Sequence, residues 1–152
     1  MWSLLCIPPL AAMIITDLRS RRVGILHLII FGITLLVASI IEFGWLQVLV
    51  NLSCNWLTIF ILWLSLYGYS RLRNMTLSEM IGSGDLWFAL AVTPYWEVRE
   101  YVIFLMISCS MTLVAWWLSG LWGRRERDIP LVTGMGACFG VMILYRTLIV
   151  LI

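Results

Sequence analysis

Two aspartates of this 152-residue chain lie in or beside apolar stretches, where a carboxylate is costly. Asp85 ends the motif Gly82-Ser83-Gly84-Asp85, and Asp17 lies in the segment Thr16-Asp17-Leu18-Arg19. An ionisable residue at membrane depth is by default a candidate functional group. Two carboxylates held close together cannot both ionise easily, so one keeps a proton while the other is charged. Such a pair can activate a water molecule and protonate a carbonyl, and we predict an acid–base dyad of Asp17 and Asp85.

The two glycines before Asp85 are expected to shape the backbone of the site. Glycine adopts backbone angles that other residues disfavour and leaves room for a close neighbour, so Gly82 and Gly84 are predicted active-site backbone residues.

The sequence does not indicate other catalytic chemistry. No motif sets a serine or cysteine beside the one histidine, His27, for which a buried neutral imidazole with a hydrogen-bond partner is favoured. The four cysteines lack C-x-x-C spacing, and we expect no metal site and no cofactor.

The composition is that of a membrane protein. The chain is 62% hydrophobic and 12% charged, with a mean hydropathy of +1.02, and soluble domains carry about twice that charged fraction. The net charge of +2 comes from ten arginines and eight acidic residues. This charge is too small and too dispersed for nucleic-acid binding, so lipid is the expected surrounding partner. We predict one transmembrane domain over residues 1–152.

The apolar stretches predict an all-α membrane protein, a polytopic bundle of about six transmembrane helices. A spanning helix needs about 20 apolar residues. The candidate spans are Trp2 to Thr16, Val23 to Ile41, Trp45 to Tyr67, Leu77 to Trp96, Tyr101 to Trp122 and Leu131 to Ile152. The part of the fourth span after Asp85 is too short to cross, so we expect its helix to begin earlier. Gly82 and Gly84 would weaken a continuous helix before Asp85. A helix that is broken or re-entrant at membrane depth is tolerated only where it lines a cavity.

The arginines predict the orientation. Eight of the ten follow the first, third and fifth candidate spans, at positions 19, 21, 22, 71, 73, 124, 125 and 127. Cytoplasmic loops are enriched in basic residues, so this side is predicted to be cytoplasmic and both chain termini to lie outside. Asp17 and Asp85 both fall at the predicted cytoplasmic face.

Three segments together resemble a known family. Asp17-Leu18-Arg19, Gly82-Ser83-Gly84-Asp85 and Ile129-Pro130-Leu131-Val132-Thr133-Gly134 resemble, in order and spacing, the three signature regions of type IV prepilin peptidases, the G-x-G-D intramembrane aspartyl proteases. The resemblance covers essentially the whole chain. It implies that Asp17 and Asp85 form the catalytic dyad of a peptidase in a bacterial or archaeal cytoplasmic membrane. That peptidase removes the short basic leader of type IV prepilins or pseudopilins at the cytoplasmic face, in pilus or protein-secretion systems.

The chain departs from the family pattern at several places. Val23-Gly24-Ile25 stands where isoleucine-proline-asparagine commonly follows the first motif, and Trp87 stands where lysine is common. Many members carry a cytosolic zinc-binding C-x-x-C insertion between their first spans and methylate the new N-terminus. The connection from Thr16 to Val23 is too short for this insertion, so we expect a short form with peptidase but no methyltransferase activity.

Three acidic residues on the predicted cytoplasmic face, Glu79, Glu126 and Asp128, could attract the basic leader of a prepilin. Their alternative role is simple solvation among neighbouring arginines. A hypothesis of a different class is a small transporter or membrane assembly subunit that uses Asp17 and Asp85 for proton relay or ion pairing. That hypothesis predicts ion or solute flux, whereas the peptidase hypothesis predicts a shortened prepilin.

Several other polar or small residues have structural interpretations. Gly134, Gly136 and Gly140 are expected to allow close helix packing. Asn51 and Asn55, one helical turn apart, are expected to form hydrogen bonds between helices. Arg146 is expected to extend towards the membrane surface, with an ion pair to Glu42 as the alternative.

Overall fold

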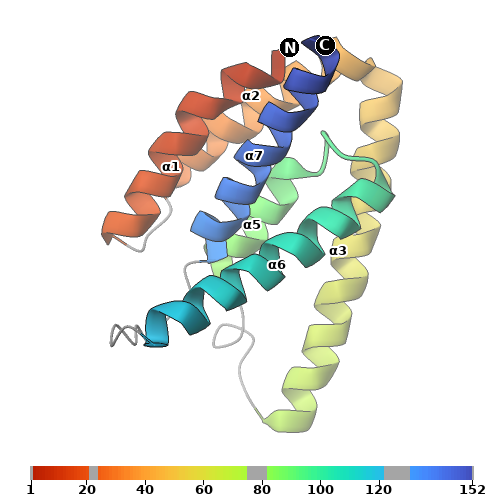
Figure 1. The fold of residues 1–152 in the computed structure, drawn as a ribbon. Coiled ribbons are helices and arrows are strands. Elements are labelled where there is room, and N and C mark those ends of the chain that lie inside the picture. The colour runs from red at the N-terminus through yellow and green to blue at the C-terminus, as the bar shows by residue number, and fades with distance from the viewer. Residues whose placement is uncertain (1, 21–23, 75–81, 122–130, 152) are drawn as a thin grey trace.

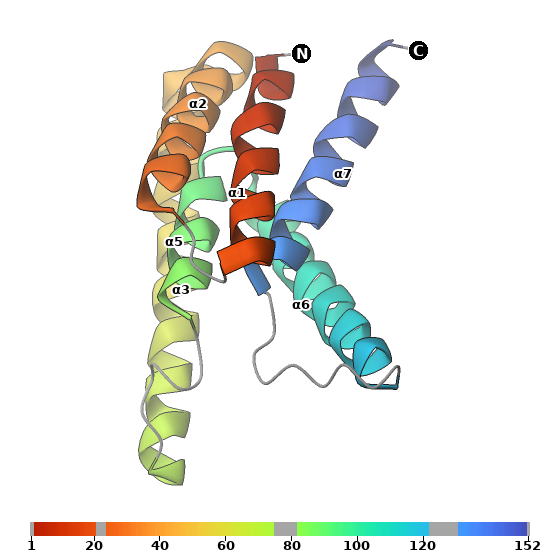
Figure 2. The ribbon, with the colours of Figure 1, turned by 90° about the vertical axis from the view of Figure 1, so that its left-hand side faces the viewer.

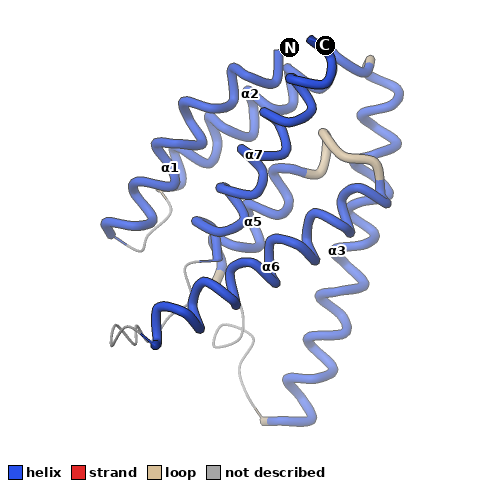
Figure 3. Tube along the Cα trace, viewed as in Figure 1, coloured by secondary structure: helices blue, strands red, loops and turns tan. Residues whose placement is uncertain are grey.

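A computed structural model of the chain describes residues 2–20, 24–74, 82–121 and 131–151. Every regular element in these ranges is a helix (Figure 3). The elements are η1 (Trp2–Cys6), α1 (Ile7–Ser20), α2 (Ile25–Phe43), α3 (Trp45–Arg73), α5 (Ser83–Val92), α6 (Val98–Leu121) and α7 (Leu131–Leu151). Four of them, α2, α3, α6 and α7, are long and apolar enough to cross a membrane. The predicted all-α fold is confirmed, and so is its transmembrane-helix character.

The first and fourth candidate spans are shorter than expected. The apolar part of the first span is Leu4–Asp17. Pro8 and Pro9 lie in the first turn of α1, where their missing N–H groups break no helical hydrogen bond.

The helix of the fourth candidate span, α5, has ten residues and is about 15 Å long at the usual rise per residue. We expected it to begin before the glycine motif, but Gly82 is extended (φ −64°, ψ 137°) and the helix starts at Ser83. Glycine's low helix propensity accounts for this start, and residues 77–81 lie outside the described ranges.

The helices bring three chain segments to one end of the bundle. α5 packs against α2 and α7, while α1 packs against α2 and α7 as well. Figures 1 and 2 show the two termini at one end. The C-terminal end of α1 and the N-terminal ends of α5 and α7 lie at the other end, while the second half of α3 runs beyond the rest of the bundle. Asp17 and Asp85 therefore belong to helix ends at the same end of the bundle.

The sharp reversal between α2 and α3 depends on Gly44. This single residue ends α2 and begins α3, with φ 83° and ψ 155°. A side chain strongly disfavours that combination of angles, and only glycine adopts it readily. No atom lies within 4 Å of a Cβ placed there, so backbone angle rather than space demands glycine at this position.

The core is an aromatic cluster centred on Phe139 of α7. Its ring makes edge contacts with the rings of five buried residues, at centroid distances from 5.7 to 6.5 Å. These five are Phe31 of α2, Phe88 of α5, Tyr95 and Trp96 of the α5–α6 connection, and Phe104 of α6. Lipid tails are as apolar as the side chains of the helices, so helices gain little hydrophobic free energy when they associate in a membrane. Close packing of this kind therefore stabilises the bundle. One residue thus joins four helices.

We expect Phe139→Ala to destabilise the folded protein by about 3–5 kcal/mol, because it leaves a cavity shared by four helices. Phe60→Ala is the matched control, since Phe60 lies on α3 with 56% of its surface exposed. The measurement is reversible unfolding in mixed micelles of detergent and SDS. Equal loss of stability in the two variants would contradict the central place of Phe139.

Candidate active site

Asp17 lies near the end of α1 and is buried, with 8% of its surface exposed. The C-terminal end of a helix carries partial negative charge, so a carboxylate there needs donors from elsewhere. Thr133, near the start of α7, supplies two. Its backbone N–H donates to Asp17 Oδ2 at 3.1 Å and its hydroxyl donates to the same oxygen at 2.6 Å.

Asp85 lies in the first turn of α5, the helix that is too short to be one of the four spans. The backbone N–H groups of Gly82 and Val132 hydrogen-bond to its carboxylate. Burial of the carboxyl group and, next, the charge of Asp17 raise the pKa of Asp85 to about 6, although the two amide hydrogen bonds oppose this rise. Asp85 therefore keeps its proton more readily than an ordinary aspartate does.

The N-terminus of α7 connects the two carboxylates. Val132 donates to Asp85 and the next residue, Thr133, donates to Asp17. A helix N-terminus presents free N–H groups and partial positive charge, which favour a nearby anion. The fold thus brings together the two aspartates that the sequence singled out, with α7 as the element that holds both.

The far end of α5 is fixed by side chains from two neighbouring helices. Asn55 of α3 is fully buried, and its Nδ2 donates to the carbonyl oxygens of Thr93 at 2.9 Å and Trp96 at 2.7 Å. The hydroxyl of Tyr101 donates to the carbonyl of Ala89 at 3.0 Å. The expected interhelical role of Asn55 is confirmed, whereas Asn51 accepts a hydrogen bond from Gln47 within α3. These bonds hold the short helix that carries Asp85.

Gly82 is needed for the space beside Asp85 rather than for an unusual backbone angle. Neither Gly82 nor Gly84 has a positive φ. A Cβ at Gly82 would lie 2.8 Å from Asp85 Oδ2, so a side chain there would displace the carboxylate.

Glycines of α7 allow the close helix packing that we predicted. A Cβ at Gly134 would overlap Thr112 of α6, and one at Gly136 would lie 3.0 Å from Ile14 of α1. The start of α7 can therefore approach α6 and α1 closely.

Three of the predicted site residues, Glu79, Glu126 and Asp128, lie outside the described residues. Within the described ranges, no three His, Cys, Asp or Glu side chains gather as a metal site would require. The sequence interpretation missed Thr133 and Val132 as donors. Their position at the start of an apolar helix could have indicated free N–H donors. The sequence did not show which residues those donors would contact.

Two other sequence expectations concern His27 and Arg146. Nδ1 of His27 is buried and has no hydrogen-bond partner among the described residues, so the expected partner is not found there. Arg146 forms an ion pair with an acidic residue of α6. Its guanidinium lies 3.6 Å from Glu100 and over the rings of Phe43, Tyr95 and Trp96, at 5.1 to 6.0 Å from their centroids. Ion pairing and cation–π attraction hold it there.

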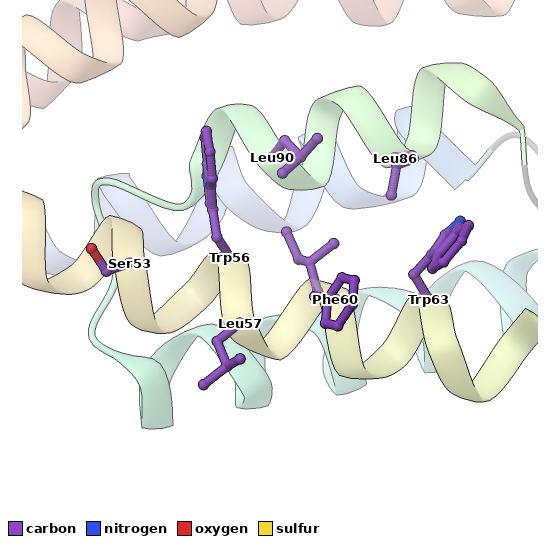
Figure 4. A pocket seen from close by; sticks show the side chains of 8 residues that line it. Ser53, Trp56, Leu57, Phe60, Trp63, Leu86 and Leu90 are labelled. Atoms are coloured by element: carbon purple, nitrogen blue, oxygen red, sulfur yellow. The ribbon is translucent and has the colours of Figure 1, made fainter.

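An open apolar groove of about 470 Å³ runs between α3 and α5 (Figure 4). Its lining residues are Ser53, Trp56, Leu57, Ile59, Phe60, Trp63, Leu86 and Leu90. None of them titrates, so the groove cannot supply acid–base chemistry itself. Leu86, which lines the groove, directly follows Asp85 in the first turn of α5.

No family model, curated protein or solved structure matches this chain.

The Gly134–Thr112 contact yields a test of the packing at the site. Gly134→Ala should destabilise the protein by about 1–3 kcal/mol, because the added methyl group overlaps Thr112. Thr112→Ala in the same chain should restore part of that loss, since it removes the hydroxyl and methyl groups nearest the new Cβ. A double-mutant cycle of unfolding in detergent measures the coupling, and independent effects of the two changes would contradict the contact.

Proposed function

We propose that this chain is a membrane-embedded aspartyl endopeptidase that uses Asp17 and Asp85 to remove the basic leader from type IV prepilins or pseudopilins. The observation that carries the proposal is the pairing of two carboxylates on adjacent amides of α7. The proposal places the chain in the cytoplasmic membrane of a bacterium or archaeon. In this proposal the chain has six spans and both of its termini lie outside. The aspartate pair lies at the cytoplasmic face, where the prepilin leader is.

The reaction needs one charged and one protonated carboxyl group. The charged one takes a proton from a water molecule as the water oxygen attacks the scissile carbonyl carbon. The protonated one gives its proton to the carbonyl oxygen, which produces a neutral tetrahedral diol. Collapse of the diol breaks the C–N bond, the leaving amine takes a proton from the first carboxyl group, and a diol hydroxyl returns one to the second. The pair ends in its starting protonation state.

The site has two properties that suit this chemistry. The raised pKa of Asp85 keeps a proton available for donation beside a second carboxylate. The groove between α3 and α5 is apolar and open, and its Leu86 follows Asp85 in the chain, so in this proposal it receives the hydrophobic helix that follows a prepilin leader. The small transporter or assembly subunit remains the competing hypothesis, and it needs no cleavage.

We expect Asp17→Asn and Asp85→Asn each to lower the rate of leader cleavage by about 100-fold or more, because a dyad needs both its base and its acid. The measurement is cleavage of a prepilin in membranes, at equal amounts of inserted enzyme. Glu97→Gln is the matched control, since this exposed acid lies in the connection after α5, away from Asp85. Near-normal cleavage by either aspartate variant would refute the dyad. Ion flux that both aspartates control, without cleavage, would favour the transporter.

Gly82→Ala should lower kcat for leader cleavage by about 10- to 100-fold, since displacement of a reacting group by about an ångström is costly. The new Cβ would lie 2.8 Å from Asp85 Oδ2, whereas Gly82 has φ −64°, an angle that alanine adopts freely. Gly68→Ala in α3 is the control, because no atom lies within 4 Å of a Cβ at that position. An unchanged kcat in Gly82→Ala would show that the position of the Asp85 carboxylate does not depend on the absence of a side chain at Gly82.

A further inference from the structure

The C-terminal half of α3 is an exposed helix that ends in two arginines. α3 has 29 residues and is about 43 Å long at the usual rise per residue, whereas the apolar core of a membrane is about 30 Å thick. Its second half runs beyond the rest of the bundle (Figures 1 and 2). Arg71 and Arg73 lie in its last turn, and both are exposed. A helix of this length that crosses the apolar core places its arginine end among the lipid headgroups.

An aromatic stripe on one face of α3 connects the apolar groove with Arg71. Phe60, Trp63 and Tyr67 follow one another at intervals of three and four residues, so they share one face of the helix. Their rings stack in succession, with centroid distances of 6.4 Å from Phe60 to Trp63 and 5.7 Å from Trp63 to Tyr67. Phe60 and Trp63 line the groove, and Trp63 lies at one end of it (Figure 4). Arg71 follows Tyr67 by one turn and continues the stripe beyond the groove.

Tyr67 orients the guanidinium of Arg71. Nε and Nη2 of Arg71 each donate a hydrogen bond to Tyr67 Oη at 3.2 Å. A guanidinium has more N–H groups than these two bonds use, and its planar fork matches the oxygens of a phosphate. In the part of the chain that the structure describes, no acidic side chain forms an ion pair with Arg71, whereas Arg146 pairs with Glu100. Arg71 is thus an oriented cation whose charge an external anion can balance.

We propose that Arg71 and the aromatic stripe form a binding site for one anionic phospholipid. The phosphate of the lipid binds the guanidinium, and one acyl chain lies along the stripe and enters the groove between α3 and α5. Tryptophan and tyrosine suit such a place, because their rings contact acyl chains while their polar atoms reach the headgroups. An anionic lipid is favoured over a zwitterionic one, since a zwitterionic headgroup also carries a positive charge that Arg71 repels.

Lipid binding at this site does not depend on the proposed peptidase function, because no aspartate takes part in it. If the chain is a peptidase, its substrate helix displaces the acyl chain from the groove. Loss of leader cleavage in the aspartate variants would leave the lipid site unchanged, and loss of lipid binding would leave the aspartate pair in place.

Arg73 provides a matched control for Arg71. It follows Arg71 by two residues, which rotates it by about 200° around the axis of α3, onto the opposite face. Its guanidinium lies 5.8 Å from the centroid of the Tyr69 ring rather than against Tyr67. The two arginines have the same charge and lie at nearly the same depth, but only Arg71 continues the stripe.

The test is the affinity of the purified protein for phosphatidylglycerol and for phosphatidylcholine with identical acyl chains, measured by native mass spectrometry from an uncharged detergent. The parent should bind one phosphatidylglycerol about fivefold more tightly than phosphatidylcholine, the effect of about one cation at the phosphate. Arg71→Gln should abolish this preference, whereas Arg73→Gln should keep it. Tyr67→Phe keeps the ring but removes the hydroxyl that orients Arg71, so it should also weaken the preference. Trp63→Ala should weaken both lipids to the same extent, because it removes apolar contact and no charge.

Several results would overturn the proposal. Equal affinity of the parent for the two lipids would do so without any variant. Equal losses in Arg71→Gln and Arg73→Gln would show only a general attraction between the arginines and anionic lipid. Inorganic phosphate that displaces phosphatidylglycerol at equal concentration would identify free phosphate as the ligand. A dimer that Arg71→Gln abolishes, with lipid binding unchanged, would identify a second copy of the chain as the occupant.

Discussion

The cost of a charged carboxylate inside an apolar bundle is the constraint on which the arrangement of this protein depends. Asp17 is buried at the end of a helix whose own terminus disfavours its charge. It can remain there only because the first turn of α7 offers unpaired N–H groups and a threonine hydroxyl. The same turn offers an amide to Asp85. One helix N-terminus therefore accounts both for the presence of two acids and for their closeness.

The rest of the fold keeps that turn in place. Small residues let α7 approach α6 at Thr112 and α1 at Ile14, so a larger side chain at Gly134 or Gly136 would separate the helices that carry the site. Phe139, two turns further along α7, packs against aromatic rings from three other helices and the α5–α6 connection. Packing rather than the hydrophobic effect supplies the stability of such a bundle in lipid.

The short helix α5 shows how backbone and side chains share the task of placing one carboxylate. Gly82 begins it in an extended conformation and leaves space for Asp85, while Asn55 and Tyr101 hold its other end by hydrogen bonds. The ten residues of α5 are too few to cross the apolar core of a membrane by themselves, so the position of this helix depends on its neighbours. That dependence fits the catalytic role proposed for Asp85, because a catalytic group must be held by rigid surroundings.

The sequence by itself determined the all-helical membrane character and the positions of the long helices, because hydropathy over about 20 residues is a local property. It also marked Asp17 and Asp85, since a charge among apolar residues is conspicuous without any structure. It could not identify Thr133 and Val132 as their donors, nor Glu100 and three aromatic rings as the surroundings of Arg146. It also missed the start of α5 at Ser83. Such contacts join segments far apart in the chain, and only the packing of the helices decides which donor reaches which acceptor.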